Sequence, residues 1–380
     1  MKFVGRPPIC LAHGSDLSIP SGATDRVVAF VNGLVNADYD VHLVVPKPEA
    51  TLPDGMEGVY VHTVNSMERG VANQITRATR LSLKAKKIVN NTGGLLQIEH
   101  STLAGFASVM GCSDYILDMH DLCYTDPLYL NLPFSRYVQR CIYKIERRAV
   151  ENASKIIVVS GPMQKFLTDE WGVPEDKIEV IPSGFFASKI SDSISQSQVD
   201  PNIISRVGSL FVHLDIDAII ALAESLQATG VKILLVGGGV AENELRVKVK
   251  KQNLENVVIR GWVPHDEALR IMQSSLVTFE SIRDTMTTRL ASPIKVLNYA
   301  ALGKSIVLSD VSELGMVFKE NDAALVSDPS NIEQFVENVH LLLNDADLRN
   351  RLGNNALNLV HGYSWEKQGE KLAKILDDMN

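Results

Sequence analysis

The chain has 380 residues, more than one hydrophobic core normally supports, so its length predicts two domains. Its 45% hydrophobic and 22% charged residues are typical of a globular protein, and the net charge of −8 argues against a nucleic-acid-binding protein, which should carry a dominant basic surface. The four cysteines lack metal-binding spacing, residues 1–8 hold no apolar signal segment, and no run reaches the roughly 20 apolar residues of a membrane span. These features predict a cytoplasmic protein with small, buried, reduced cysteines.

The first half of the chain alternates short apolar runs with helix-like segments. Apolar runs that stop at Gly or Ser predict buried parallel strands, here at residues 8–12, 41–46, 59–62, 95–100, 114–121, 156–160 and 179–181. Apolar residues at helical spacing predict helices at residues 25–36, 73–91, 101–111, 134–152 and 162–170.

The second half opens after residues 187–202, a stretch rich in Ser, Asp and Gln without periodicity that predicts a linker. Strands are then expected at residues 205–209, 231–236, 257–260, 276–279, 305–308 and 323–326. Helices are expected at residues 217–228, 242–252, 265–274, 294–302, 312–318, 332–344 and 365–379. Strands of this kind end where backbone N–H groups and helix N-termini can meet an anion, so two such sheets facing across a hinge predict a cleft for a nucleotide.

Four landmarks occur in a recognisable order. They are Ile-Ile-Val-Val-Ser (156–160) followed by Lys-Ile-Glu-Val-Ile-Pro-Ser-Gly (177–184), Leu-Leu-Val-Gly-Gly-Gly (234–239), Asn-Val-Val-Ile-Arg-Gly-Trp-Val-Pro (256–264), and Ser-Pro-Ile-Lys-Val-Leu-Asn-Tyr-Ala-Ala-Leu-Gly-Lys (292–304). From about Pro20 to the C-terminus, the chain resembles the retaining glycosyltransferases of family 4, which have the GT-B fold.

The resemblance implies an α/β architecture of two Rossmann-like domains facing across a cleft. Residues 1–186 would form the acceptor domain, residues 187–202 the linker and residues 203–363 the nucleotide-sugar donor domain. The C-terminal helix, residues 364–380, would pack back on the N-terminal domain. Such enzymes move a sugar from a nucleotide-diphosphate sugar to an acceptor hydroxyl.

Candidate site residues in the first half follow predicted strands. Ser21 and Gly22 lie in the first β-α turn, where glycine permits close backbone approach, and the family has a Gly-Gly loop here near the donor phosphates and the acceptor. The alternative reading is an ordinary turn. His120 ends a strand, and the resemblance implies that it hydrogen-bonds the transferred sugar as a catalytic residue, although a lone histidine usually has a structural role. His100 and Asp121 are expected on the acceptor side.

Asp118 and Asp121 flank His120 and resemble an acid/base pair. We favour orienting or capping roles for them, because retaining transferases of this type lack an obvious protein nucleophile.

Candidate donor-binding residues in the second half are Arg206, Gly208, Ser209, Gly237, Gly238, Arg283 and Asn298, and Lys295 and Arg289 are the expected catalytic cations. Two positions depart from the family pattern. Leu214 stands where a lysine is expected, and Asn298 replaces a glutamate that accepts ribose hydroxyls. A charged hydrogen bond is worth roughly 1.5–3 kcal/mol, so another cation must compensate. The alternative for Arg283 and Arg289 is a solvated loop.

The sequence therefore predicts a metal-independent retaining glycosyltransferase without a cofactor. Its expected partners are a UDP- or GDP-linked sugar and a sugar or lipid-linked acceptor, and no nucleic acid. Two basic helical stretches would suit the inner membrane face, although a solvated helix face explains them as well. Their cations are Arg77, Arg80, Lys84, Lys86 and Lys87, then Arg136, Arg140, Lys144, Arg147 and Arg148.

Two other functions remain open. A catalytically silent GT-B protein that binds a sugar or a partner would explain Leu214 and Asn298. A nucleotide-sugar epimerase of the same fold would need carboxylates and histidines placed for proton transfer on the sugar, and the sequence does not identify that set.

Overall fold

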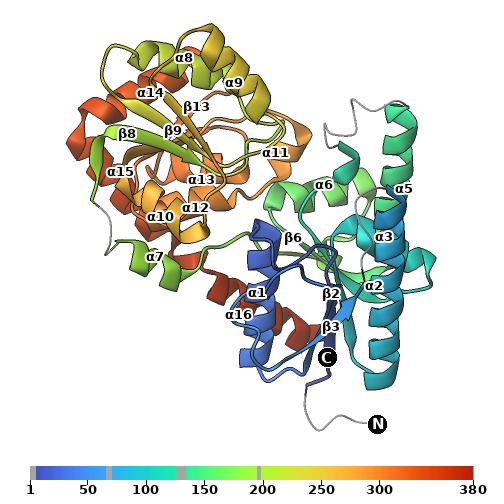
Figure 1. Ribbon diagram of the computed structural model, residues 1–380. Coiled ribbons are helices and arrows are strands. Elements are labelled where there is room, and N and C mark those ends of the chain that lie inside the picture. The colour runs from blue at the N-terminus through green and yellow to red at the C-terminus, as the bar shows by residue number, and fades with distance from the viewer. Residues whose placement is uncertain (1–5, 66–70, 126–133, 195–197, 380) are drawn as a thin grey trace. The chain divides into compact units, whose positions relative to one another are not determined.

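The computed structural model describes residues 6–65, 71–125, 134–194 and 198–379, which form two compact α/β units (Figure 1). Unit 1 comprises residues 1–183 and 365–380, and unit 2 comprises residues 184–364. The two breaks fall close to the sequence-based boundaries at residues 186 and 363.

Unit 1 is built on a seven-stranded, fully parallel sheet with the order β3-β2-β1-β4-β5-β6-β7. The strands are β1 (Ile9–Ala12), β2 (Val41–Pro46), β3 (Val59–Val64), β4 (Leu95–Glu99), β5 (Tyr115–Met119), β6 (Ala153–Val158) and β7 (Ile178–Val180). Every residue of β1 and β5 is buried, as expected for central strands that helices cover on both faces.

The helices of unit 1 are α1 (Gly22–Asn36), α2 (Val71–Thr92), α3 (Ser101–Val109), α5 (Ser135–Asn152), α6 (Gly161–Trp171) and α16 (Trp365–Met379). As predicted, the C-terminal helix α16 packs back on this unit, where it lies beside α1 (Figure 1). Gly33 of α1 faces Gly369 of α16, and a Cβ atom on either residue would run into the backbone of the other helix.

Unit 2 is built on a six-stranded parallel sheet with the order β10-β9-β8-β11-β12-β13. The strands are β8 (Asp200–Val207), β9 (Lys232–Val236), β10 (Val257–Gly261), β11 (Ser275–Glu280), β12 (Ile306–Ser309) and β13 (Leu325–Ser327). The helices are α7 (Ala187–Ile194), α8 (Ile216–Leu226), α9 (Glu242–Lys251), α10 (His265–Ser274), α11 (Met286–Leu290), α12 (Ile294–Ala301), α13 (Glu313–Glu320), α14 (Ile332–Asn344) and α15 (Ala346–Leu359).

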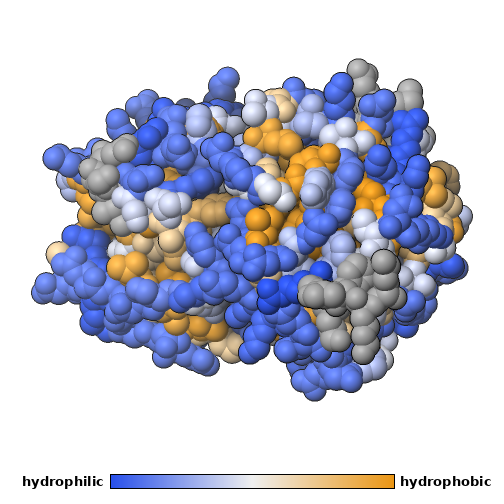
Figure 2. Space-filling view, turned by 90° about the horizontal axis from the view of Figure 1, so that it is seen from below, coloured by the Kyte–Doolittle hydropathy of each residue, from blue (hydrophilic) through white to orange (hydrophobic). Residues whose placement is uncertain are grey.

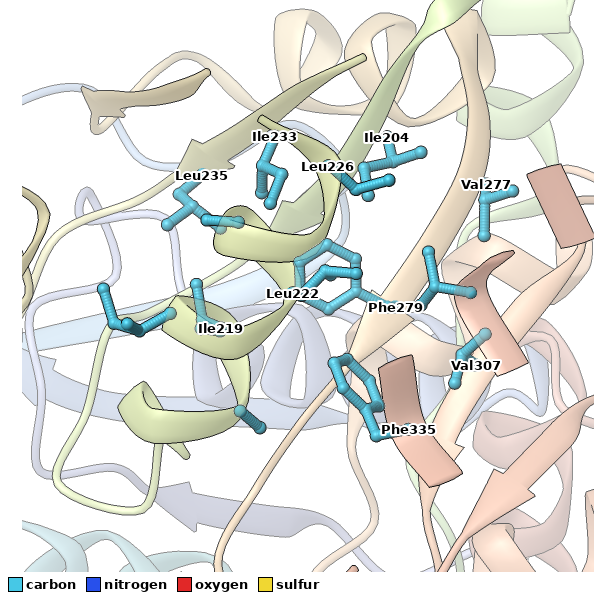
Figure 3. Packing of buried hydrophobic residues seen from close by; sticks show 14 of the residues in the cluster. Ile204, Ile219, Leu222, Leu226, Ile233, Leu235, Val277, Phe279, Val307 and Phe335 are labelled. Carbon is cyan, nitrogen blue, oxygen red and sulfur yellow. The ribbon is translucent and has the colours of Figure 1, made fainter. Parts of the chain in front are cut away.

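The core of unit 2 shows why its helices dock on the sheet. Leu222 of α8 and Phe335 of α14 pack around Phe279 of β11 (Figure 3), and the two phenylalanine rings meet edge to face with centroids 5.8 Å apart. All three side chains are at most 3% exposed. Burying such side chains contributes about 1.5–3 kcal/mol each.

The predicted two-domain α/β fold is confirmed, and each expected strand is present with its ends shifted by a few residues. The segment 187–202 differs from the expected linker. It contains α7, which packs against α10 and α12, and it continues into β8 from Asp200, while residues 195–197 lie outside the described part of the chain. Among residues 187–192 of α7, whose side chains the structure describes, Ile190 is the buried one, and one buried position gives no periodicity in the sequence.

Hydrophilic residues cover most of the face shown in Figure 2, with apolar patches between them. Among the described residues, none of the helices combines the length and the apolar content that crossing a bilayer requires.

Candidate functional site

The two sheets share one strand order, which is that of the dinucleotide-binding folds. In such sheets, ligands bind beyond the carboxyl ends of the strands at the point where the strand order reverses. In unit 1 this point lies between β1 and β4, and in unit 2 between β8 and β11. Each unit places a buried set of charged side chains there.

In unit 1, the charged set is centred on Asp118 of β5. Arg26 of α1 donates two hydrogen bonds to this carboxylate, each 2.8 Å long, and both residues are at most 2% exposed. His120 Nε2 lies 3.0 Å from the second carboxylate oxygen of Asp118 and 3.3 Å from Glu99 Oε1. Glu99, in turn, hydrogen-bonds Nδ1 of His13. The structure thus gives His120 two carboxylate neighbours.

The neighbouring charges shift the pKa values of Asp118 and His120. Burial alone would raise the pKa of Asp118, but Arg26 and His120 outweigh it and hold that pKa well below its usual range. Burial alone would lower the pKa of His120, but Asp118, and then Glu99, outweigh it and raise that pKa.

A small cavity of about 10 Å³ adjoins this set, lined by side chains that include His13, Gln97, Glu99 and Asp118. Among the described residues, His13 Nε2 and Gln97 Oε1 have no hydrogen-bond partner. The cavity is too small for a sugar and has about the size of one water molecule.

The acceptor-side candidates His100 and Asp121 lie together with Cys123, beyond the ends of β4 and β5. His100 Nε2 is 3.5 Å from both Asp121 Oδ1 and Cys123 Sγ. His100 has a backbone φ of +81°, a strained value for a residue other than glycine.

Glu146 of α5 supports this edge of the sheet, and the sequence analysis missed it. Its buried carboxylate accepts hydrogen bonds from Ser101 Oγ (2.6 Å) and from the backbone N–H groups of Cys123 (2.9 Å) and Tyr124 (3.0 Å). Burial raises its pKa to about 7, although these hydrogen bonds oppose the shift. The available signal was an acidic residue on the same helix face as the buried Ala149 and Val150.

Ser21 and Gly22 occupy the start of α1. The hydroxyl of Ser21 accepts a hydrogen bond from the backbone N–H of Thr24 and caps the helix. Gly22 is the first helical residue. The local contacts of Ser21 are therefore those of a helix cap that follows β1.

In unit 2, the charged set is centred on Glu280, at the end of β11. Arg206 of β8 donates to Glu280 Oε1 over 3.0 Å, and Lys295 of α12 donates to the same oxygen over 2.9 Å. Arg206 also donates to the carbonyl oxygens of Gly208 and Ser209. Within the described part of the chain, Arg206 Nε and Glu280 Oε2 have no hydrogen-bond partner.

The charges of this second set follow from its contacts. Burial alone would raise the pKa of Glu280, but Arg206 and then Lys295 outweigh it, so the carboxyl has a lowered pKa and stays ionised. Burial lowers the pKa of Lys295 despite its contact with Glu280, and its side chain keeps 21% of its surface exposed. Two cations share one carboxylate, which leaves a net positive charge at the carboxyl ends of β8 and β11.

The glycine loops close around this set. Gly208 has a φ of +140°, and a Cβ atom at that position would lie 2.7 Å from Lys295 Cε. Gly237 has a φ of +123°, and its Cβ would run into the backbone of Gly208. A Cβ atom at Gly238 would lie 2.6 Å from Nε1 of the Trp262 side chain. These glycines let Lys295 and the two loops approach one another.

The remaining candidates of unit 2 have different surroundings. Leu214 is a core residue, 2% exposed, so the position of the missing family lysine faces inward. Asn298 is buried on α12. Arg283 is exposed, and Arg289 is exposed and donates two hydrogen bonds to Asp284. The structure thus brings together Arg206, Gly208, Ser209, Gly237 and Lys295.

Among the described residues of unit 1, two groups offer donor atoms suited to a metal ion. They are Glu99 with Asp118 and His120, and His100 with Asp121 and Cys123. In the first group, the guanidinium of Arg26 already occupies both oxygens of Asp118, and its positive charge would repel a cation.

Comparisons with known proteins agree with this architecture. The model for glycosyl transferases group 1 matches residues 188–359, and that for glycosyltransferase family 4 matches residues 20–187. The uncharacterized glycosyltransferase MJ1607 of Methanocaldococcus jannaschii is 23% identical over 62% of this chain, and the match spans 63% of that relative's length.

Solved structures match over nearly the whole chain. A sucrose-phosphate synthase from Thermosynechococcus elongatus has a TM-score of 0.76 at 18% identity, covering 98% of this chain and 99% of its own. Anabaena HepE, solved with UDP-glucose, has a TM-score of 0.72 at 15% identity, covering 98% of this chain and 99% of its own. The lipopolysaccharide-biosynthesis glycosyltransferase WaaG has a TM-score of 0.73 at 14% identity, covering 97% of this chain and 99% of its own. With the two family models covering both halves, the chain belongs to the glycosyltransferases of family 4 and has their GT-B fold.

Proposed function

We propose that this protein is a retaining glycosyltransferase that uses a nucleotide-diphosphate sugar. The observation that carries the proposal is the set formed by Arg206, Glu280 and Lys295 at the strand-order reversal of unit 2. This set holds two cations at the place in the fold where nucleotides bind.

We propose that the same set takes over the role of the lysine that the family has at the position of Leu214. Lys295 crosses Gly208, and Arg206 holds the backbone of residues 208 and 209, so a cation lies beside the loop although Leu214 is buried. We propose that the exposed part of Lys295 contacts the diphosphate and stabilises the negative charge that develops as the glycosidic bond breaks. Arg206 would act mainly by holding Glu280 and the loop.

For the donor, we propose a UDP-linked hexose. HepE, which shares the fold, was solved with UDP-glucose, and this supports the choice of base and sugar. Asn298 in place of a ribose-binding glutamate lacks a charge, so we expect weaker donor binding than a carboxylate would provide.

For unit 1, we propose that His120 contacts the transferred sugar while the acceptor hydroxyl attacks on the face from which the diphosphate leaves. The leaving phosphate oxygen takes the proton of that hydroxyl, so the step needs neither a metal ion nor a protein nucleophile. The contacts of His120 with Asp118 and Glu99 support this role because they fix the orientation of the ring.

For the acceptor, we propose a sugar or a lipid-linked sugar. Phe134 and Tyr137, which are 85% and 71% exposed, stand at the start of α5 beside Arg136 and Arg140. Exposed aromatic residues among basic ones suit a membrane surface, and this supports peripheral contact with lipid.

Calorimetric titration of the whole chain with UDP, GDP and ADP tests the donor site. We expect binding in the micromolar range that favours UDP, and weakening by about ten- to a hundredfold in Lys295→Ala. Arg351→Ala is the matched control, since this exposed cation of unit 2 pairs with Asp322 away from the set. Absence of binding to all three nucleotides would favour the silent GT-B protein to which Leu214 and Asn298 point.

A further inference from the structure

We propose that His100, Asp121 and Cys123 form a binding site for a divalent transition metal ion of the zinc type. The three residues meet because β4 and β5 are neighbouring parallel strands. His100 follows β4 directly, and Asp121 and Cys123 follow β5, so three metal-binding side chains gather at one edge of the sheet.

The donor atoms have the spacing of a tetrahedral metal site. The three separations, Nε2 to Oδ1, Nε2 to Sγ and Sγ to Oδ1, are each 3.5 Å. Zinc bonds of about 2.0–2.3 Å at tetrahedral angles place the ligand atoms roughly 3.3–3.6 Å apart. A direct hydrogen bond between an imidazolium and a carboxylate would be shorter, at about 2.7–2.9 Å. The spacing between His100 and Asp121 therefore fits a shared metal ion better than an ion pair.

The imidazole of His100 is held in a suitable orientation. Its Nδ1 lies 2.9 Å from Thr102 Oγ1. When Nδ1–H donates to that hydroxyl, the lone pair of Nε2 is directed at the site, and metal-binding histidines are commonly fixed in this way. The backbone of Cys123 is fixed in turn by Glu146.

The donor atoms and the exposure of His100, Asp121 and Cys123 indicate which ion the site would hold. One nitrogen, one sulfur and one carboxylate oxygen make a set that zinc accepts, whereas magnesium and calcium prefer oxygen alone. The side chains of His100 and Asp121 are 37% and 44% exposed, and Cys123 is buried. Three protein ligands with an open side leave room for a water molecule in the fourth position.

A bound ion would tie the segment after β5 to the start of α3. That segment also carries His120, so the ion would fix the backbone beside a residue that the proposed reaction uses. The metal site itself does not depend on the proposed function, since its test measures metal binding alone.

The test is metal binding by the whole chain. After removal of metal by a chelator, the protein is titrated with zinc against a chromophoric competitor, and then with cobalt(II). We expect one zinc ion per chain, and with cobalt a thiolate-to-metal charge-transfer band together with the intense visible bands of tetrahedral coordination. Absence of zinc binding, or cobalt spectra without a thiolate band, would overturn the proposal.

Variants locate the site. Cys123→Ser and His100→Asn should each weaken zinc binding by more than about a hundredfold, and Thr102→Val by about tenfold. Asparagine is chosen at position 100 because it tolerates a positive φ. Cys141→Ser on α5 and His62→Gln, whose ring lies against His42 on β2, are the matched controls and should bind zinc as the wild type does. Equal binding by Cys123→Ser, with an unchanged circular dichroism spectrum, would contradict the assignment.

Discussion

His120 and Lys295 are the two side chains whose removal separates the two proposed roles, contact with the transferred sugar and contact with the diphosphate. Each contacts a buried carboxylate that also has an arginine partner, Asp118 with Arg26 and Glu280 with Arg206. Replacing either residue therefore leaves its carboxylate paired, and the protein should still fold.

His120→Ala should lower kcat/KM for sugar transfer by about ten- to a hundredfold, because a charge-assisted hydrogen bond to the sugar is lost. Binding of UDP alone should be unchanged, because UDP carries no sugar. Steady-state kinetics and calorimetry measure the two quantities, with the exposed His361→Ala as the control. Full transfer activity in His120→Ala would show that this histidine is structural.

Glu280→Gln should behave differently, because it leaves the buried Arg206 and the partly buried Lys295 side by side without a carboxylate. Breaking a buried ion pair from one side costs about 3–5 kcal/mol. Urea unfolding followed by circular dichroism should therefore show a larger loss of stability in Glu280→Gln than in Lys295→Met. Equal stability of the two variants would mean that Glu280 does not hold the set together.

Lys304 gives stability a pH dependence. It is 6% exposed, its ammonium donates to the carbonyl oxygen of Gln273, and burial lowers its pKa to about 8, with Arg349 adding to the effect. Between this pKa and the ordinary value of 10.5, the unfolded chain binds more protons than the folded one, so stability should rise with pH across that window.

Lys304→Met removes the charged form and should stabilise the fold by about 1–3 kcal/mol at pH 7, with the gain shrinking toward pH 10. Urea midpoints at several pH values measure the gain, and the exposed Lys232→Met is the control. A gain that stays constant with pH would show that the buried charge of Lys304 is not its cause.

At the scale of the element, the contact between α1 and α16 depends on two glycines. Gly33→Val should destabilise unit 1 by about 1–3 kcal/mol, because the new side chain meets the backbone of α16 at Gly369. Gly362→Ala is the control, since a Cβ atom there meets nothing within 4 Å. Thermal unfolding distinguishes the two, and an unchanged midpoint in Gly33→Val would show that α16 can shift away.

The sequence predicts the strands better than helices α7 and α15 for a physical reason. Central strands such as β5 are buried on both faces and read as unbroken apolar runs. The helix α15 was missed because Gly353 and its asparagines are poor helix formers, although Gly353 is needed where α15 meets the backbone of Gly303. Helix α7 was missed because, among its described side chains at residues 187–192, Ile190 is the one that is buried.

Sequence reasoning named Asp118 and Arg206 but missed their partners, Arg26 and Glu280. Arg26 and Asp118 are separated by 92 positions, and Arg206 and Glu280 by 74. Such pairs form because the topology brings strand ends together, and no local spacing indicates them. The resemblance to a family predicted roles for His120 and Lys295, and the structure shows which carboxylates contact them.

At the scale of the whole molecule, we propose that the two units, whose sheets share one strand order, have different roles in the transfer. Unit 2 would hold the donor through Lys295, and unit 1 would supply His120 for the transferred sugar. The family fixes the fold, and the set around Glu280 supports the proposal of an active donor site although Leu214 replaces the usual lysine.

The most direct test of this account is proton NMR of the whole chain incubated with UDP-glucose, with water or a sugar as the acceptor. The account predicts slow release of UDP and a first-formed product that keeps the α configuration of the donor. It also predicts that Lys295→Met abolishes this turnover, whereas Arg351→Ala does not. A β product would contradict the retaining mechanism, and the absence of turnover with UDP-glucose and other nucleotide sugars would contradict the assignment of an active donor site.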